Sequence, residues 1–151
     1  MEKVLNNLRR QCSRREYCTS DILKKAQKAL DGDAAKAMQV LEVLVKEKYV
    51  DDSRYASAYA REKSSIAGWG DVKIRYMLSA KGIAKDIISG ALEEIDSNRA
   101  ESRLEKLLEN KYRTLKDDPQ WKLKLIRFAL GRGYSYDQVN GYVSKINKET
   151  D

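Results

Sequence analysis

Two stretches of the chain repeat each other, and this repeat limits the folds available to it. "MLSAKGIAKDIISGAL" (77–92) aligns with "FALGRGYSYDQVNGYV" (128–143) at a constant offset of 51, which places Lys81-Gly82-Ile83 on Arg132-Gly133-Tyr134. Each copy predicts the end of one helix, a glycine stop, an apolar residue and a new helix. Weaker copies lie at 14–21 and 45–52. Such short helices cannot bury an apolar face alone, so the units must stack.

Helical periodicity extends over the rest of the chain. Pro119 is the only proline, and no segment alternates with period two for long enough to predict a strand. The spacing predicts about nine helices. Their predicted apolar stripes include Ala37, Met38, Leu41, Leu44 and Val45; Tyr55, Ala56, Tyr59 and Ala60 in a helix beginning at Asp51; and Val72, Ile74, Met77 and Leu78. We predict an all-α tandem array of three three-helix repeats, elongated and able to curve, at 1–48, 49–95 and 96–151.

The net charge of the chain favours an acidic partner. There are 30 Lys and Arg residues against 23 Asp and Glu, which gives a formal charge of +7 and a pI near 9.3. Such a balance is typical of proteins that bind a polyanion or an acidic protein surface. No long apolar segment and no secretory leader are present, so we expect a cytoplasmic protein without a membrane contact.

The absence of histidine excludes several kinds of site. Zinc sites built from cysteine and histidine, and every catalytic triad that needs histidine, are ruled out by composition. Cys12 and Cys18 are the only cysteines, and we expect both to be reduced residues, buried or at helix ends. We predict no cofactor, no metal and no catalytic residue.

The adjacent carboxylates Asp51 and Asp52 have two interpretations. An enzymatic hypothesis would use them to hold a divalent cation, but such sites need several converging oxygen ligands, and no calcium-loop spacing is present. The structural interpretation, which we favour, makes Asp51 a helix N-cap and places Asp52 in the first turn, where the helix dipole favours negative charge.

Gly68-Trp69-Gly70 marks a predicted corner between helices. Its spacing matches neither G-x-x-x-x-G-K-[ST] nor G-x-G-x-x-G, and it follows a helix rather than a strand, so a phosphate-binding loop is not indicated. Trp69 is either packed against the helices or exposed as a contact residue. Base stacking by the nine tyrosines is a further possibility, but Tyr55, Tyr59, Tyr76, Tyr112 and Tyr142 fall on or beside apolar stripes, and we expect most of them in the core.

Basic residues around the predicted corner form the candidate binding surface. Two helices folded together can bring most of them to one side, where phosphate contacts would give salt-dependent affinity. The alternative is a scattered, solvated surface. The residues predicted for contact are Arg61, Lys63, Lys73, Arg75, Lys81, Lys85 and Arg132, which Arg9, Arg10, Arg14, Arg15 and Arg127 could extend.

The sequence resembles the RecX family of bacterial recombination regulators. "YVDDSRYA" (49–56) matches an apolar-Asp-Asp-x-Arg-aromatic-Ala element of that family, and "GWGDVKIRYMLSAKGI" (68–83) matches its glycine-rich corner and Lys-Gly-Ile series. "LGRGYSYDQV" (130–139) and "REYCTSDIL" (15–23) add support at either side. Two departures are Cys18, where the family usually has Ser, and Lys48, where Gly is common.

The resemblance implies a partner that the composition alone does not name. Members of this family bind the RecA recombinase filament, lie along its groove and typically limit ATP hydrolysis and strand exchange. We therefore expect a monomeric, non-enzymatic regulator that contacts RecA filaments and, weakly and electrostatically, single- and double-stranded DNA. The alternative is a non-specific nucleic-acid-binding helical module without a recombinase partner.

Overall fold

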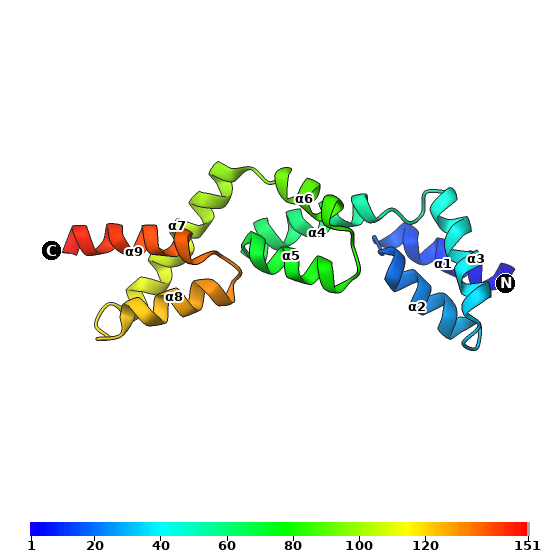
Figure 1. Cartoon of the computed structure of the whole chain (residues 1–151), viewed down its shortest axis with the longest axis horizontal. Coiled ribbons are helices and arrows are strands. Elements are labelled where there is room, and N and C mark those ends of the chain that lie inside the picture. Colours follow the sequence, from blue (N-terminus) through cyan, green and yellow to red (C-terminus); the bar gives the residue numbers. More distant parts are fainter. Residues whose placement is uncertain (151) are drawn as a thin grey trace. The chain divides into compact units, whose positions relative to one another are not determined.

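The computed structural model describes the backbone of residues 1–150 and the side chains of residues 1–146. Within this range the chain forms nine α-helices and no strand, which confirms the predicted all-α class (Figure 1). The helices are α1 (Glu2–Arg14), α2 (Thr19–Ala29), α3 (Ala34–Lys46), α4 (Asp52–Ser65), α5 (Asp71–Ala80), α6 (Lys85–Glu93), α7 (Ser97–Leu115), α8 (Trp121–Gly131) and α9 (Tyr136–Thr150).

The helices belong to two compact units, which are considered separately below. Unit 1 comprises Met1–Tyr59 and Leu78–Ala91, and unit 2 comprises Ala60–Met77 and Leu92–Asp151. The division therefore passes through α4 and α5. The repeat boundaries at 1–48, 49–95 and 96–151 stay a prediction.

The core of unit 1 forms where α1, α2 and α3 pack on one another (Figure 1). Ile22 and Ala26 on α2 are four residues apart and thus share one face of the helix, and both are fully buried. Their partners in the same cluster include Leu5, Leu8, Ala37, Val40, Leu41, Leu44 and Val50.

The core of unit 2 repeats this arrangement with α8 between α7 and α9. Leu125 and Ala129 on α8 are again four residues apart and fully buried. They belong to a cluster with Leu104, Leu108, Tyr134, Val139, Val143 and Ile146. On α5, Ile74 and Leu78 show the same spacing and the same complete burial, so the second helices of the three predicted repeats align on these buried pairs.

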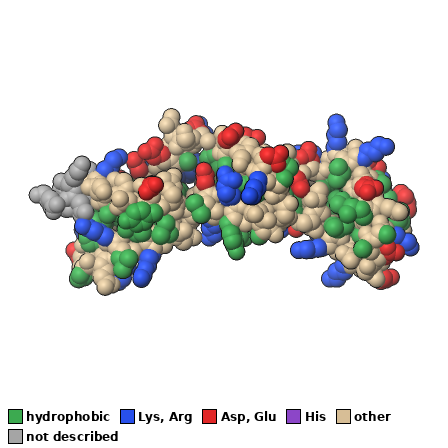
Figure 2. Space-filling model, in the orientation of Figure 1, with side chains coloured by type: hydrophobic (Ala, Val, Ile, Leu, Met, Phe, Trp, Pro, Cys, Tyr) green, Lys and Arg blue, Asp and Glu red, His purple; other side chains and the backbone are tan. Residues whose placement is uncertain are grey.

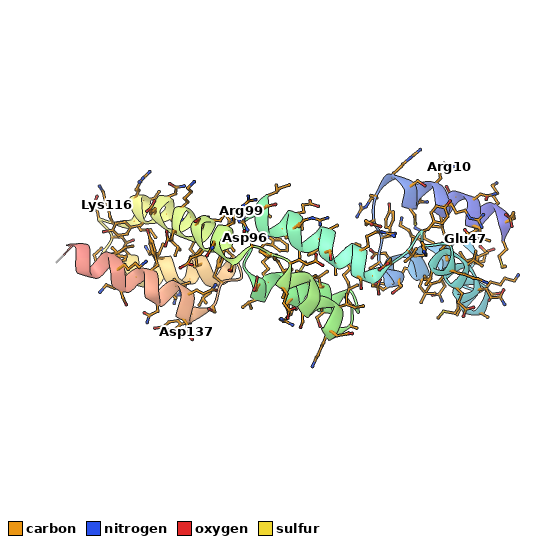
Figure 3. The ribbon with its side chains drawn as sticks, turned by 90° about the horizontal axis from the view of Figure 1, so that it is seen from above. Arg10, Glu47, Asp96, Arg99, Lys116 and Asp137 are labelled. Atoms are coloured by element: carbon orange, nitrogen blue, oxygen red, sulfur yellow. The ribbon has the colours of Figure 1, made fainter. Side chains whose placement is uncertain are left out.

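The predicted helix starts are confirmed by their side-chain contacts. Asp51 accepts a hydrogen bond from the Arg54 N–H at 3.1 Å and caps α4, which begins one residue later than predicted. Ser135 and Gln138 form a reciprocal capping box at the start of α9, with bonds of 2.8 and 3.3 Å. Asp96 caps α7, at the end of that helix where Figure 3 also labels Arg99.

Several residues predicted for apolar stripes are instead exposed. Val72 and Tyr76 on α5 retain 58% and 72% of their accessible surface, and Met77 is also exposed. Met38 and Val45 on α3 are exposed too. The physical reason is that a helix turns about 100° per residue, which places Val72 opposite the buried Ile74. The expectation that Tyr76 lies in the core was therefore wrong, whereas Tyr55 is buried as predicted.

The two departures from the family pattern both have structural consequences. Cys18, the N-cap residue of α2, is fully buried and makes no side-chain capping bond; its Sγ lies 3.2 Å from the Ser20 Oγ. Burial raises the pKa of its thiol. Lys48 follows α3 with φ of +66°, a left-handed conformation that glycine adopts more readily. Both cysteines are free thiols, Cys12 half-buried, as expected.

Candidate functional site

The seven predicted contact residues are divided between the two units. Lys81 and Lys85 lie in unit 1, and the other five, Arg61, Lys63, Lys73, Arg75 and Arg132, lie in unit 2. Arg61, Arg75 and Lys85 are exposed, and the remaining four are half-buried. Most of the predicted surface thus falls in unit 2, on the segment 60–77 and on the turn after α8.

In unit 1, the turn before α2 is joined to residues of two other helices; we call this contact region the first junction. The Asp52 carboxylate on α4 accepts hydrogen bonds from the Thr19 N–H at 2.8 Å and the Thr19 hydroxyl at 3.0 Å. It therefore supplies, from another helix, the cap that Cys18 does not. The Ser20 hydroxyl donates to the Lys81 carbonyl at 2.7 Å, in the glycine turn after α5.

A salt bridge completes the first junction. The Lys81 Nζ lies 3.0 Å from an Asp21 carboxylate oxygen. Burial acts to raise the pKa of Asp21, but the hydrogen bonds from Lys81 and Cys18 and the charge of Lys81 outweigh it, so this pKa lies below its ordinary value. The hydrogen bond to Asp21 raises the pKa of Lys81. Lys81, a predicted contact residue, is thus already neutralised within unit 1.

In unit 2, the turn between α4 and α5 is joined to the turn between α8 and α9; we call this contact region the second junction. The Gly70 N–H donates to the Arg132 carbonyl at 2.8 Å, and the Val72 N–H donates to the Gly133 carbonyl at 3.0 Å. The Tyr134 hydroxyl donates to the Gly68 carbonyl at 2.8 Å. Burial raises the pKa of that hydroxyl.

The second junction depends on two glycines. A Cβ on Gly70 would overlap the Gly133 carbonyl, and a Cβ on Gly133 would overlap the Cβ of Lys73. Gly133 also has φ of +95°, in the left-handed region. The predicted corner at Gly68-Trp69-Gly70 is confirmed, and its second glycine is the point where two backbones touch.

Cationic side chains gather on aromatic rings around the second junction. The Nζ atoms of Lys63 and Lys73 lie 4.9 and 4.3 Å from the centre of the half-buried Trp69 ring. The Arg132 guanidinium lies 5.2 Å from the Phe128 ring, and one of its N–H groups reaches the Ala67 carbonyl at 3.4 Å. Contacts of this kind contribute about 0.5–1 kcal/mol each at exposed sites and restrict where the charges can move.

Sequence reasoning missed one member of this cluster and one role. The Lys111 Nζ lies 4.9 Å from the centre of the Phe128 ring. Lys111 was not among the predicted contact residues. Its position four residues before the end of α7 gave no signal in the sequence. Asp52 was expected only to interact favourably with the dipole of its own helix. Its hydrogen bond with Thr19 joins two residues that no local sequence pattern connects.

The arginines of α1 belong to unit 1 and make contacts of their own there. Arg9 forms two hydrogen bonds with the Glu47 carboxylate, at 2.8 and 2.9 Å. Arg10 on α1 and Glu47 near the end of α3 are labelled in Figure 3, and Arg10 lines an open groove with Lys3, Lys25 and Lys28. Over α1–α3 the basic side chains stand apart from one another on the face seen in Figure 2.

The described part of the chain holds no cluster of three or more Cys, Asp or Glu side chains arranged to hold a metal ion. Asp51 and Asp52 each serve a different helix start. None of the helices within the described range has the length and apolar character needed to cross a membrane.

Successive helix–turn–helix units joined turn to turn define the chain as an all-α protein of tandem three-helix domains. Residues 51–92 match the second three-helix domain of RecX, and residues 100–143 match the third. The chain is 34% identical over 127 residues to "Regulatory protein RecX" of Clostridium perfringens (strain 13 / Type A), which covers 82% of this chain and 58% of that protein. The chain therefore belongs to the RecX family.

A second relative is similar in sequence, and a solved structure is similar in fold. "Regulatory protein RecX" of Streptococcus equi subsp. zooepidemicus is 31% identical over 113 residues, 74% of this chain and 43% of its own. The crystal structure of RecX from Lactobacillus salivarius has the same fold, with a TM-score of 0.84, 21% identity and coverage of 97% of this chain and 96% of that one. The chain spans between 51% and 58% of the length of three curated relatives that it matches.

Proposed function

We propose that the protein is a non-enzymatic regulator that binds the RecA recombinase filament and inhibits its ATPase and strand-exchange activities. Family membership supports the choice of partner, because the relatives are named as regulatory proteins and the resemblance to RecX implies RecA. The observation that carries the proposal to particular residues is the cationic cluster at the second junction, where Lys63, Lys73 and Arg132 are held on aromatic rings.

The charge of the chain supports the same partner. A filament of recombinase on DNA presents both phosphates and acidic protein side chains, and a protein of charge +7 is attracted to either. Long-range attraction would speed capture, while contacts at the second junction would set the lifetime of the complex.

A charge-reversal experiment tests the proposal. RecA ATPase on single-stranded DNA is measured with the protein added at sub-stoichiometric levels. The parent should inhibit, and the triple variant Lys63→Glu, Lys73→Glu, Arg132→Glu should lose most of this inhibition while retaining its helical circular dichroism. The matched control, Lys24→Glu, Lys36→Glu, Lys46→Glu, changes the same charge at exposed positions of unit 1. Equal inhibition by the two triple variants at physiological salt would rule out the residue assignment.

The rival function is a non-specific nucleic-acid-binding module, which the cation–aromatic cluster would also suit. Such a module would bind naked DNA and the recombinase filament equally, with affinity falling steeply as salt rises. Titration of fluorescent oligonucleotides, alone and coated with RecA, separates the two functions. Preference for the coated strand is the result expected from a filament regulator.

A further inference from the structure

The two junctions have the same construction but opposite electrostatics. Helices α2 and α5 can be aligned on their buried pairs, which are Ile22–Ala26 and Ile74–Leu78. In this alignment Asp21 and Lys73 occupy equivalent positions, each directly before the first buried residue. The turns that they meet carry Lys81 and Arg132, each directly before a glycine of positive φ. These two positions thus hold an aspartate and a lysine at the first junction, where they form a salt bridge, and a lysine and an arginine at the second.

The backbone contacts show that the second pair is close. Val72 donates its N–H to the Gly133 carbonyl, and Lys73 packs so closely on Gly133 that no Cβ fits there. Lys73 and Arg132 therefore project from adjoining backbone. At the first junction, the corresponding side chains form the 3.0 Å salt bridge between Asp21 and Lys81.

No carboxylate takes the place of Asp21 at the second junction. Neither Lys73 nor Arg132 takes part in a salt bridge among the side chains of residues 1–146. Asp71, in the first turn of α5, lies close enough to Tyr134 to affect its pKa, but it forms no described salt bridge with either cation. Within the chain, Lys73 lies on the Trp69 ring and Arg132 on the Phe128 ring. Like charges on side chains from adjoining backbone repel each other, and an anion from outside the chain would stabilise them.

Apolar side chains beside the cation pair indicate what kind of anion it is. Val72 and Tyr76 lie one turn apart on α5, so they share a face, and they are among the most exposed large apolar residues described. Figure 2 shows hydrophobic side chains reaching the surface over α5. Exposed apolar residues rimmed by charge mark protein contacts more than phosphate contacts, because phosphate groups themselves offer no apolar atoms to cover such residues.

We propose that the second junction is a docking site for an acidic protein surface, in which a partner carboxylate binds between Lys73 and Arg132 as Asp21 binds Lys81, and apolar partner atoms cover Val72 and Tyr76. This inference rests on the proposed function, since the partner it serves is the recombinase filament. It deepens that function by assigning the site to the protein component of the filament rather than to its DNA.

The test restores the missing carboxylate within the chain itself. Lys73→Asp places an aspartate where the first junction has Asp21, so Arg132 gains an internal partner and the site no longer needs an external one. We expect the melting temperature to equal or exceed that of the parent and the affinity for RecA filaments to fall at least tenfold. Lys46→Asp on α3 makes the same charge change at an exposed position of unit 1 and should alter that affinity less than twofold.

A second pair of variants distinguishes a protein partner from DNA. The double variant Val72→Ser, Tyr76→Ser should bind RecA-coated oligonucleotide at least tenfold more weakly and naked oligonucleotide equally well. Met38→Ser, Val45→Ser removes similarly exposed apolar residues from α3 and serves as the control. Unchanged filament binding by the Val72→Ser, Tyr76→Ser variant would overturn the docking site. The same conclusion would follow if Lys73→Asp lost as much affinity for naked DNA as it lost for the filament. Failure of the parent to bind filaments would overturn the proposed function, and the docking site with it.

Discussion

Asp52 on α4 caps α2 by accepting two hydrogen bonds from Thr19, one from its backbone N–H and one from its hydroxyl. Its neighbour Asp51 caps α4 itself. The adjacent carboxylates thus serve two different helices, and the start of α2 depends on α4 being in place. This relationship gives each of the two adjacent acidic residues a structural role at a helix start.

Removal of the Asp52 carboxylate should destabilise the protein more than removal of an ordinary first-turn acid. Asp52→Ala leaves the Thr19 N–H without its acceptor, and loss of such a cap lowers the free energy of unfolding by about 1–2 kcal/mol. Asp137→Ala, in the first turn of α9, is the control and should cost about 0.5 kcal/mol, a dipole effect only. Urea denaturation measures both. Equal losses would show that Asp52 acts only through the dipole of α4.

Substitution of the junction glycines should be among the most destabilising single changes. Gly70→Ala and Gly133→Ala force the two turns of unit 2 apart, at a cost on the order of 3 kcal/mol. Gly90→Ala and Gly141→Ala add a methyl group to α6 and α9, where it meets no atom within 4 Å, and should stabilise by about 0.5–1 kcal/mol. Thermal melts of the four variants check this ordering, and a small effect at either junction glycine would contradict it.

Lys48 offers a route to a more stable protein. A non-glycine residue in the left-handed region lowers the stability of the folded state by about 1–2 kcal/mol. Lys48→Gly removes this strain, but glycine also makes the unfolded chain more flexible, which offsets part of the gain. We expect a net stabilisation of about 0.5–1 kcal/mol. Asp31, with φ of +55°, is the control. Because aspartate tolerates this conformation better than lysine, Asp31→Gly should gain less, and a gain equal to that at Lys48 would refute the explanation by strain.

The salt bridge at the first junction should make stability depend on pH. The folded-state pKa of Asp21 is lowered, so its contribution is complete above the unfolded pKa of about 3.9 and disappears as the pH falls through the folded value. Asp21→Asn should therefore lower the free energy of unfolding at pH 7 by about 1 kcal/mol, allowing for partial exposure of Lys81. At acidic pH, where Asp21 becomes protonated in the parent, the difference in free energy of unfolding between Asp21→Asn and the parent should become smaller.

The alkaline limb provides a second check on the same pair. The folded-state pKa of Lys81 is raised, so its contribution is complete below the unfolded pKa of about 10.4 and is lost as the pH rises through the folded value. Asp117→Asn changes an exposed acid and serves as the control. Denaturation curves measured from acid to alkaline pH should show that the difference in free energy of unfolding from the parent shrinks at both extremes for Asp21→Asn but not for Asp117→Asn. If the free energies of the parent and both variants changed in parallel with pH, a role for the Asp21–Lys81 pair would be excluded.

Local patterns in the sequence were enough to predict the helices and the Asp51 cap. The Asp51 cap depends on residues three positions apart and is present as predicted. The spacing of Leu125 and Ala129, like that of Ile74 and Leu78, correctly marked buried faces. The family resemblance was also sound, because its motifs are local as well.

The features that escaped prediction depend on contacts between residues distant in the sequence. Nothing near Asp52 reveals that its acceptor oxygens meet Thr19, and nothing near Lys111 reveals that it shares the Phe128 ring with Arg132. The error at Val72 had a different cause, since the stripe there was drawn too wide for a helix that buries only one narrow face. A basic residue count likewise could not separate the paired Lys81 from Lys73.

The hydrogen bonds of the second junction also determine how this part of the molecule opens. Because the amides of Gly70 and Val72 donate to the carbonyls of Arg132 and Gly133, their protons are shielded from solvent only while the turn between α8 and α9 stays closed. In a hydrogen–deuterium exchange experiment these two amides would exchange at the rate of that distant turn rather than at the rate of their own segment. They are natural reporters of partner-induced changes in α8 and α9, readable from a peptide that contains neither helix.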